Sequence, residues 1–345
     1  MNRSLRRIED CGDFAGQLDL PRMCRSTTSD ALEVFDPQLL SPLIEDLQTR
    51  VPQLGKVDQT LAGIARQIIA ADGTYMTTLC DVAWALRHKI PNGRMQGQVR
   101  ANVQLNVSNW VPQVLSISGD DGQSEPAAFA ADVLSGVLYV IDRGFVEFNF
   151  LSRVLERSSD FVLRIKDNQP KMTVVQSLQL CAADVEAGII AEQVVRLDGR
   201  GAPAGLFRLI TIHTVDRQGK AQTIRLLTNL PVATVAAHMV AAVYRLRWQI
   251  ELFFKWFKTW ANMDHLLSTS RNGITTQFYI LVIAVLMMHV QSGYRVSIYT
   301  LAALSRVAQG RMSVQQAMEV IAKRERERAM ERARQAKKRA RKKLA

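Results

Sequence analysis

The chain has 345 residues, which is too long for one small domain and suits either one large domain with an insertion or two domains. Hydrophobic residues make up 48% and charged residues 22%, the proportions of a soluble globular protein with a core. The formal net charge of +12 indicates a polyanionic partner, either nucleic acid or an anionic membrane.

Residues 1–60 are expected to form a helical N-terminal region, since apolar residues recur there at helical spacing after residues that favour an N-cap. This region could contact DNA or pack against the core. The first residues have charges but no apolar signal core.

Residues 61–165 are expected to form a layered α/β domain. The predicted strands are 65–74, 99–107, 111–119, 137–141 and 160–165, and the predicted helices are 124–134 and 147–157. The strand 99–107 alternates strictly between apolar and polar residues, which predicts a half-buried strand that pairs antiparallel with 111–119. The continuous apolar run 137–141 predicts a strand covered on both faces.

Residues 166–232 break this rhythm with strand-like segments and glycine-rich turns, which predicts a mostly β insertion. Helices are expected over 233–295, followed by a helical and basic tail over 296–345. The apolar run 278–290 is shorter than the roughly 18 residues that span a bilayer, so we expect a buried helix and no membrane.

The last 23 residues, 323–345, carry a net +9 of the chain's +12. Two interpretations stay open for them, a solvated tail or an arm that contacts DNA. The four cysteines lack CxxC or Cys/His spacing, so neither a disulfide framework nor a zinc site is expected, as in a reducing cytoplasm.

The stretch YRLRWQIELFFKWFKTW, residues 244–260, is apolar nearly all round if it forms one helix. At about 100° per residue, Tyr244, Arg247, Glu251 and Lys258 fall on one narrow polar line. One interpretation is a surface stripe in which Arg247 and Glu251 form a helical ion pair; the other is a functional seam that contacts phosphates. Trp248, at the edge of this line, is expected to pack in the core rather than to stack on a base.

Two aspartates, Asp72 and Asp142, end predicted apolar strands, and glycine follows each within two residues. An Asp-Gly sequence is typical of a turn, but ligands of α/β sheets bind at the carboxyl ends of strands. Other carboxylates, Asp81, Asp120, Asp121 and Asp264, are expected at the surface.

Asp72, Asp142 and Glu251 together would form a cage of hard oxygen ligands, which Mg²⁺ prefers. Two such ions can support an in-line phosphoryl transfer. The sequence contains no glycine-rich nucleotide loop, so the expected phosphate belongs to a nucleic-acid backbone.

These residues resemble the Tyr-x2-Arg-x3-Glu-x6-Lys signature of DDE transposases of the insertion sequence 4 family, with Tyr244, Arg247, Glu251 and Lys258 in place. ADGT and VIDRGF resemble the family contexts of Asp72 and Asp142. The resemblance covers residues 60–295 and implies a ribonuclease-H-like mixed sheet flanked by helices, interrupted by a β insertion before the helix that bears the glutamate.

The resemblance further implies cut-and-paste DNA transposition. Asp72, Asp142 and Glu251 would bind two Mg²⁺ ions, with Mn²⁺ as a substitute, and Tyr244, Arg247 and Lys258 would hold DNA phosphates. Excision through a hairpin, joining to target DNA and a homodimer in the synaptic complex are family expectations. The double-stranded partners would be the terminal inverted repeats and the target, in a bacterial cytoplasm near the nucleoid. The alternatives are a nuclease of the same fold and a domesticated DNA-binding protein without catalysis.

Overall fold

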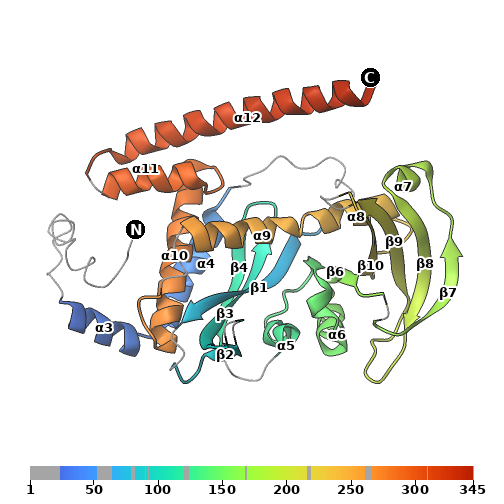
Figure 1. The fold of residues 1–345 in the computed structure, drawn as a ribbon, viewed down its shortest axis with the longest axis horizontal. Coiled ribbons are helices and arrows are strands. Elements are labelled where there is room, and N and C mark those ends of the chain that lie inside the picture. Colours follow the sequence, from blue (N-terminus) through green and yellow to red (C-terminus); the bar gives the residue numbers. More distant parts are fainter. Residues whose placement is uncertain are drawn as a thin grey trace. The chain divides into compact units, whose positions relative to one another are not determined.

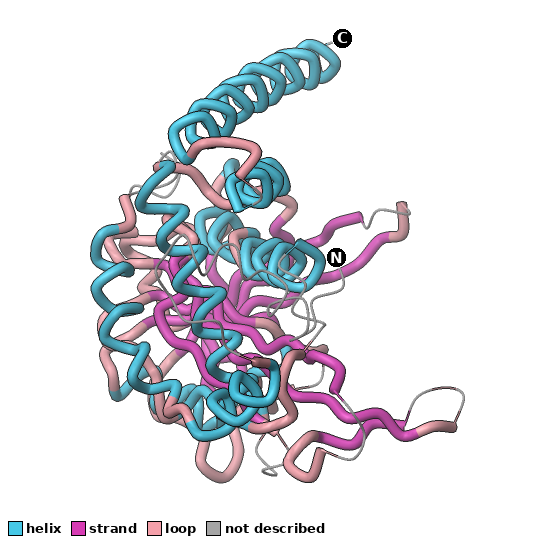
Figure 2. Tube along the Cα trace, turned by 90° about the vertical axis from the view of Figure 1, so that its left-hand side faces the viewer, coloured by secondary structure: helices cyan, strands magenta, loops and turns pink. Residues whose placement is uncertain are grey.

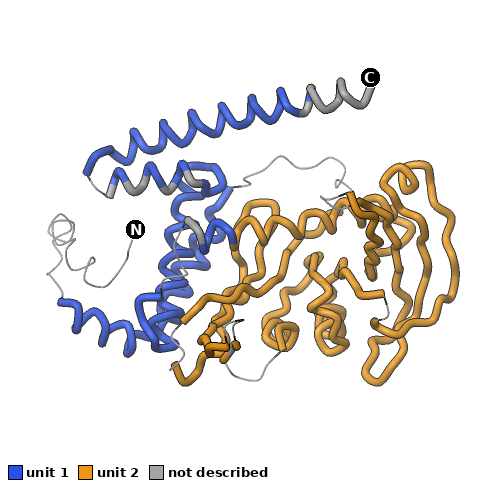
Figure 3. Tube along the Cα trace, in the orientation of Figure 1, with its two compact units in different colours: residues 1–54, 255–345 blue, residues 55–254 orange. Residues whose placement is uncertain are grey.

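The computed structural model describes residues 24–52, 64–78, 82–89, 91, 93–119, 124–167, 169–215, 219–260, 266–308 and 310–344. The chain divides into two compact units, residues 55–254 and residues 1–54 with 255–345 (Figure 3). The expected surface carboxylates Asp81, Asp120, Asp121 and Asp264 lie outside the described residues, as do residues 1–23 of the expected N-terminal region.

The unit of residues 55–254 is built on one ten-stranded mixed sheet (Figures 1 and 2). Its strands are β1 (Ile68–Thr78), β2 (Leu86–Lys89), β3 (Met95–Asn106), β4 (Val111–Ser118), β5 (Leu138–Ile141), β6 (Asp160–Ile165), β7 (Met172–Leu178), β8 (Ile189–Leu197), β9 (Phe207–Val215) and β10 (Ala221–Thr228). Its helices are α5 (Glu125–Ala130), η3 (Arg143–Phe145), α6 (Phe148–Glu156), α7 (Ala182–Glu186), α8 (Ala237–Arg245) and α9 (Trp248–Lys255).

The centre of this sheet has the topology of a ribonuclease-H-like core. The antiparallel strands β4, β3 and β1 are followed across the sheet by β5 and β6, which run parallel to β1. Helices α5 and α6 contact each other, and α8 contacts β5 and β6. In Figure 1, α5 and α6 lie below the strands while α8 and α9 run above them, so helices flank the sheet. The predicted fold class is therefore confirmed.

The predicted β insertion is present, and it extends the central sheet. Strands β10, β9, β8 and β7 follow β6 in spatial order, each antiparallel to its neighbour. The ion pair between Arg208 and Glu192 is buried here, with the two side chains 4% and 5% exposed. Arg208 Nη1 also donates to the carbonyl oxygens of Leu230 (3.1 Å) and Val235 (2.7 Å), which ties the insertion to the segment that enters α8.

Three details of the predicted sheet are wrong. Strand β1 does not end at the Asp72–Gly73 sequence but continues to Thr78, because β3 supplies antiparallel partners along its whole length. Strand β2 was not predicted. Strand β3 is not half-buried: both its faces are covered, and the polar face is held by internal hydrogen bonds, such as Arg100 Nε to Asn102 Oδ1 (2.9 Å) and Gln104 Nε2 to the Asp132 carbonyl (2.8 Å).

The second unit is helical in its described part. It contains α3 (Arg25–Val34), η1 (Pro37–Leu40), α4 (Ser41–Arg50), η4 (Trp256–Trp260), α10 (Arg271–Ser292), α11 (Ile298–Ala308) and α12 (Val314–Leu344). Helix α10 contacts α3, η1, α4 and α12. The helical expectation for the N-terminal region is thus confirmed over residues 24–52.

Helix α10 is long and apolar enough to cross a membrane by length and composition alone. The apolar run from which a buried helix was predicted has 13 residues, whereas the helix that contains it has 22. Of its most apolar window, 61% is buried within the protein, as in the core helix of a folded unit.

Candidate active site

The register of two parallel strands brings Asp72 and Asp142 together. Ala70 of β1 pairs with Val140 of β5, and each aspartate lies two residues beyond its member of this pair. Because side chains alternate along strands and adjacent strands lie about 4.8 Å apart, both carboxylates leave neighbouring strands on the same face. Asp142 caps η3 and accepts a hydrogen bond from the Arg143 amide (2.7 Å), whereas Asp72 accepts one from the Gly73 amide (2.9 Å).

The stretch 244–260 does not form one continuous helix. The prediction that Tyr244, Arg247, Glu251 and Lys258 lie on one line of a single helix is therefore wrong. Helix α8 ends at Arg245 and α9 begins at Trp248. Across the break, hydrogen bonds join residues only three positions apart, such as the bond from the Ile250 amide to the Arg247 carbonyl (3.1 Å). From Trp256 the chain continues as the π-helix η4. Tyr244 and Arg247 therefore precede α9, while Glu251 lies in its first turn.

Arg247 connects the carboxylates. Its Nη1 atom lies 3.1 Å from Glu251 Oε1 and 3.6 Å from Asp72 Oδ2, and its side chain is 14% exposed. The Tyr244 hydroxyl donates to Asp142 Oδ1 at 3.4 Å. The predicted Arg247–Glu251 ion pair is thus present, but it is part of a larger group that also includes both aspartates.

Charges in this group perturb one another. Burial, with the negative charges of Glu125 and Glu251, raises the pKa of Asp72 to about 7, although Arg247 and the Gly73 amide act in the opposite direction. Burial and the neighbouring Asp142 raise the pKa of Tyr244 to about 12. Tyr244 therefore remains a protonated hydrogen-bond donor at neutral pH.

Two contacts fix α9 against the β3–β4 hairpin. Trp110 Nε1 donates to Gln249 Oε1 (3.0 Å), and the Trp110 ring packs edge-on against Phe253 with centroids 6.4 Å apart. Trp110 and Gln249 were not identified from the sequence, because these two hydrogen-bond partners are 139 residues apart along the chain. Trp248, expected in the core, is instead 49% exposed.

Glu125 is a fourth carboxylate beside Asp72 and Asp142, and the sequence analysis missed it. It opens α5 behind the N-cap Ser124, where an acidic residue is ordinary helix chemistry, so no local signal distinguishes it. Its Oε1 atom is buried without a hydrogen-bond partner among the described residues. Burial raises its pKa most, and Asp142 adds to that effect, whereas the Gly73 amide, Arg100 and Asp72 lower it.

Lys258 lies in η4, in the helical unit, and its side chain is half-buried. The other five residues named here, Asp72, Asp142, Glu251, Tyr244 and Arg247, belong to the sheet-based unit.

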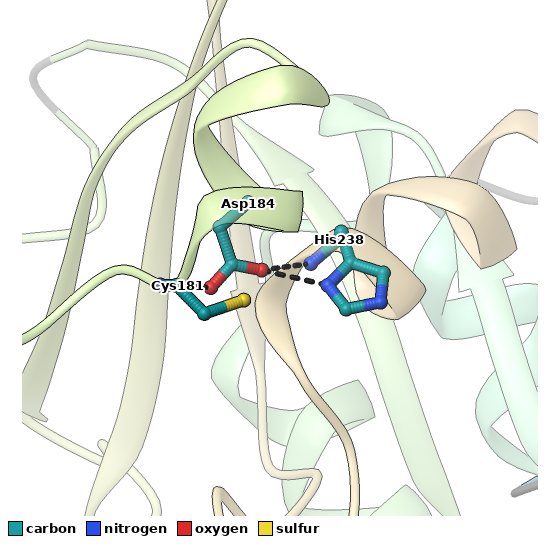
Figure 4. A group of neighbouring side chains, drawn as sticks. All are labelled: Cys181, Asp184 and His238. Carbon is teal, nitrogen blue, oxygen red and sulfur yellow. Dashed lines mark hydrogen bonds and ion pairs between the residues drawn. The ribbon is translucent and has the colours of Figure 1, made fainter.

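A second group of possible metal ligands, Cys181, Asp184 and His238, has ligand atoms within 4.8 Å of one another (Figure 4). Both Asp184 oxygens already accept backbone hydrogen bonds, from the Cys181 amide (3.0 Å) and the His238 amide (2.9 Å). Asp184 Oδ1 also lies 2.8 Å from His238 Nδ1. These bonds account for the group as a cap that joins α7 to α8.

The family model of the transposase DDE domain matches residues 64–287, which include Asp72, Asp142 and Glu251. The chain belongs to the transposase DDE domain family. The match covers most of the sheet-based unit and continues into α10 of the helical unit.

Relatives of this transposase DDE domain protein include "Putative transposase y4zB" of Sinorhizobium fredii, which is 28% identical over 203 residues, 58% of this chain and 54% of that protein. The chain thus spans about half the length of that relative. "Probable transposase for insertion sequence element IS5377" of Geobacillus stearothermophilus is 25% identical over 294 residues, 83% of this chain and 71% of that protein. The solved piggyBac transposase synaptic complex with hairpin DNA matches 66% of this chain and 52% of that chain at a TM-score of 0.34 and 11% identity, too distant to bear on function.

Proposed function

We propose that this chain is a DNA transposase that moves an insertion sequence by cut-and-paste phosphoryl transfer, with Asp72, Asp142 and Glu251 as the catalytic carboxylates. The observation that carries the proposal is the parallel register of Asp72 and Asp142, with Arg247 linking Asp72 to Glu251. These three residues come from β1, the end of β5 and α9, so only the folded sheet assembles them.

The donor set fits a hard divalent ion. Carboxylate oxygens are the ligands that Mg²⁺ and Mn²⁺ accept, and the nearby buried Glu125 Oε1 atom has no hydrogen-bond partner in the part of the chain that the structure describes. When bound, a pair of such ions would activate the attacking water or 3′-hydroxyl and stabilise the leaving oxygen. Asp72, Asp142 and Glu251 are the proposed ligands.

The chain's own cations would position DNA. Arg247 holds Asp72 and Glu251 in place and presents a charged guanidinium to phosphate, while the Tyr244 hydroxyl orients Asp142. Lys258 is proposed as a further phosphate contact. The basic helix α12 would add sequence-independent attraction to the duplex.

The DNA partners in this proposal are the terminal inverted repeats and the target duplex. Excision through a hairpin, a homodimer in the synaptic complex and a place near the bacterial nucleoid belong to the same proposal. The names of the relatives support its insertion-sequence part.

The test is cleavage and strand transfer on the element's own terminal repeats in Mg²⁺ or Mn²⁺. Asp142→Asn and Glu251→Gln should each abolish both reactions, and chelation should abolish them in the wild type. Glu156→Gln, which changes an exposed carboxylate on α6, is the matched control and should leave them unchanged. Cleavage that survives both substitutions would overturn the proposal. Cutting without preference for the repeats would favour a nuclease, and specific binding without cleavage would favour a DNA-binding protein that has lost catalysis.

A further inference from the structure

We propose that Glu125 is a fourth ligand of the divalent-metal site, binding the ion that Asp72 and Asp142 hold. This inference rests on the proposed function, because it assigns one more residue to the same site. Four features of the surroundings of Glu125 carry it.

The fold fixes the position of Glu125 relative to Asp142. Glu125 is the first residue of α5, and the Ser124 hydroxyl caps this helix by accepting from the Ala127 amide (3.3 Å). Helix α5 contacts η3, the turn that Asp142 begins. The Phe129 and Phe145 rings join the two elements with centroids 5.3 Å apart. Glu125 is therefore held by packed structure and not by a loose loop.

A glycine follows each aspartate closely, and both glycines border the Glu125 carboxylate. A Cβ atom on Gly73 would lie 2.7 Å from Glu125 Oε1, closer than atoms can approach. A Cβ atom on Gly144 would lie 3.8 Å from Glu125 Oε2, an ordinary contact. The carboxylate thus occupies the space that the missing side chain of Gly73 leaves, with one oxygen toward β1 and the other toward η3.

The Glu125 side chain is partly exposed, but one of its two carboxylate oxygens, Oε1, is buried. This atom accepts no well-aligned hydrogen bond from the described residues: the Gly73 amide donates to Asp72 Oδ1 (2.9 Å), although it lies close enough to Glu125 to lower the pKa of that carboxyl. Burying a carboxylate without compensation is strongly unfavourable. The nearby Arg100 directs its Nε donor to Asn102 Oδ1 (2.9 Å) and forms no ion pair with Glu125 among the described residues, although its charge lowers the pKa of Glu125.

Asp72, Asp142 and Glu125 therefore lie close enough to perturb one another, with two arginines nearby: Arg247, which Asp72 shares with Glu251, and Arg100, which acts on Glu125 without forming an ion pair. A divalent cation would compensate the charge of the three carboxylates, and oxygen-only donors suit Mg²⁺ or Mn²⁺. Glu251 and Glu125 would then contribute from α9 and α5, the helices on the two sides of the sheet.

The test measures Mn²⁺ binding to the full chain without DNA, by calorimetry and by electron paramagnetic resonance of free Mn²⁺. Glu125→Gln should weaken Mn²⁺ binding by about 10-fold or more, and Glu125→Asp, which keeps the charge but withdraws the oxygens, should weaken it less. Glu156→Gln should bind Mn²⁺ as the wild type does. Thermal unfolding in chelator should show Glu125→Gln as stable as the wild type or more stable, because an uncompensated charge is removed.

The outcomes separate this inference from the proposed function. If the wild type binds Mn²⁺, Asp142→Asn loses it and Glu125→Gln binds normally, the assignment of Glu125 is wrong while the metal site stands. If Glu125→Gln melts earlier in chelator and binds Mn²⁺ normally, Glu125 serves only the fold, as a partner of Arg100, and the inference is again overturned. If neither the wild type nor Asp142→Asn binds Mn²⁺, the proposed function itself fails.

Discussion

Glu125 Oε1 lies 2.7 Å from the point that a Cβ atom on Gly73 would occupy. A side chain at position 73 would therefore collide with the Glu125 carboxylate in its present position. Gly73 directly follows Asp72, and this close approach links the residue after the first aspartate to a helix about 50 residues later in the chain.

Gly73→Ala is expected to displace the Glu125 carboxylate and the neighbouring Arg100 side chain, whose Cδ lies 3.0 Å from the same point. Because the atoms that must move belong to two long, flexible side chains, we expect a loss of at most about 1 kcal/mol in the free energy of unfolding, with weaker Mn²⁺ binding because the Glu125 oxygens are displaced. Denaturant unfolding and calorimetry measure the two effects. Gly144→Ala, where the added atom meets only an ordinary contact, is the control; equal behaviour of the two variants would contradict the steric argument.

Arg247→Ala should reduce strand transfer by about 10- to 100-fold, since it removes the group that holds Asp72 and Glu251 in place. Arg247→Lys should restore little, because an ammonium cannot span both carboxylates as the planar guanidinium does. Rates at saturating Mg²⁺ on a terminal-repeat substrate measure the effect. Arg245→Ala removes an exposed arginine two residues away and should be nearly silent; a similar defect in this control would point to general loss of charge.

Trp110→Phe should keep the ring contact with Phe253 and lose the hydrogen bond to Gln249. The expected cost is about 1 kcal/mol of stability together with slower chemistry, because α9 then holds Glu251 less rigidly. Single-turnover cleavage and thermal unfolding separate the two effects. Unchanged cleavage in a destabilised Trp110→Phe protein would show that Trp110 supports the fold alone.

The cap at Asp184 should make stability depend on pH. Burial would raise the pKa of Asp184, but hydrogen bonds from Cys181 and His238 outweigh it and lower that pKa to about 2. The stabilisation is therefore present above pH 4 and is lost as the pH falls from about 4 to about 2. Asp184→Asn should unfold about 2 kcal/mol more easily than the wild type at pH 7. Urea unfolding at a series of pH values measures this gap, and a gap that stays constant down to pH 2 would contradict the assignment.

His289 in α10 should contribute to acid sensitivity. Burial and the nearby Arg295 lower its pKa to about 3, and its Nε2 atom accepts from the Val296 amide (3.3 Å). In the unfolded chain His289 binds a proton near pH 6.5, whereas in the folded chain it stays neutral until about pH 3. The free energy of unfolding therefore falls as the pH drops from about 6.5 toward 3. His289→Gln should flatten this dependence in thermal unfolding curves. His213→Gln, at an exposed position, should leave the dependence unchanged.

Periodicity and turn residues along the chain were sufficient to predict a layered α/β domain, whereas its ribonuclease-H-like topology was implied by the family resemblance. The apolar run of β5, the alternation in β3 and the glycine-rich turns of the insertion are local signals, and the order of the predicted strands and helices follows from them. The polar residues of the 244–260 stretch were likewise identified by their spacing. Asp72 and Asp142 were identified by their positions at the ends of predicted strands.

What the linear sequence did not determine is decided by long-range packing. Strand β1 continues past Asp72 because β3 pairs with it, and the polar face of β3 is buried because neighbouring elements supply its hydrogen bonds. Arg247 lies in the break between α8 and α9, which the spacing along the chain did not predict, and its guanidinium reaches Asp72. In the sequence, Glu125 resembles any acidic residue in the first turn of a helix. It becomes part of the proposed site only because the folded sheet places Asp72, Gly73 and Asp142 close to the start of α5. Local propensities act over a few residues, whereas the arrangement of carboxylates depends on contacts between segments that lie far apart in the chain.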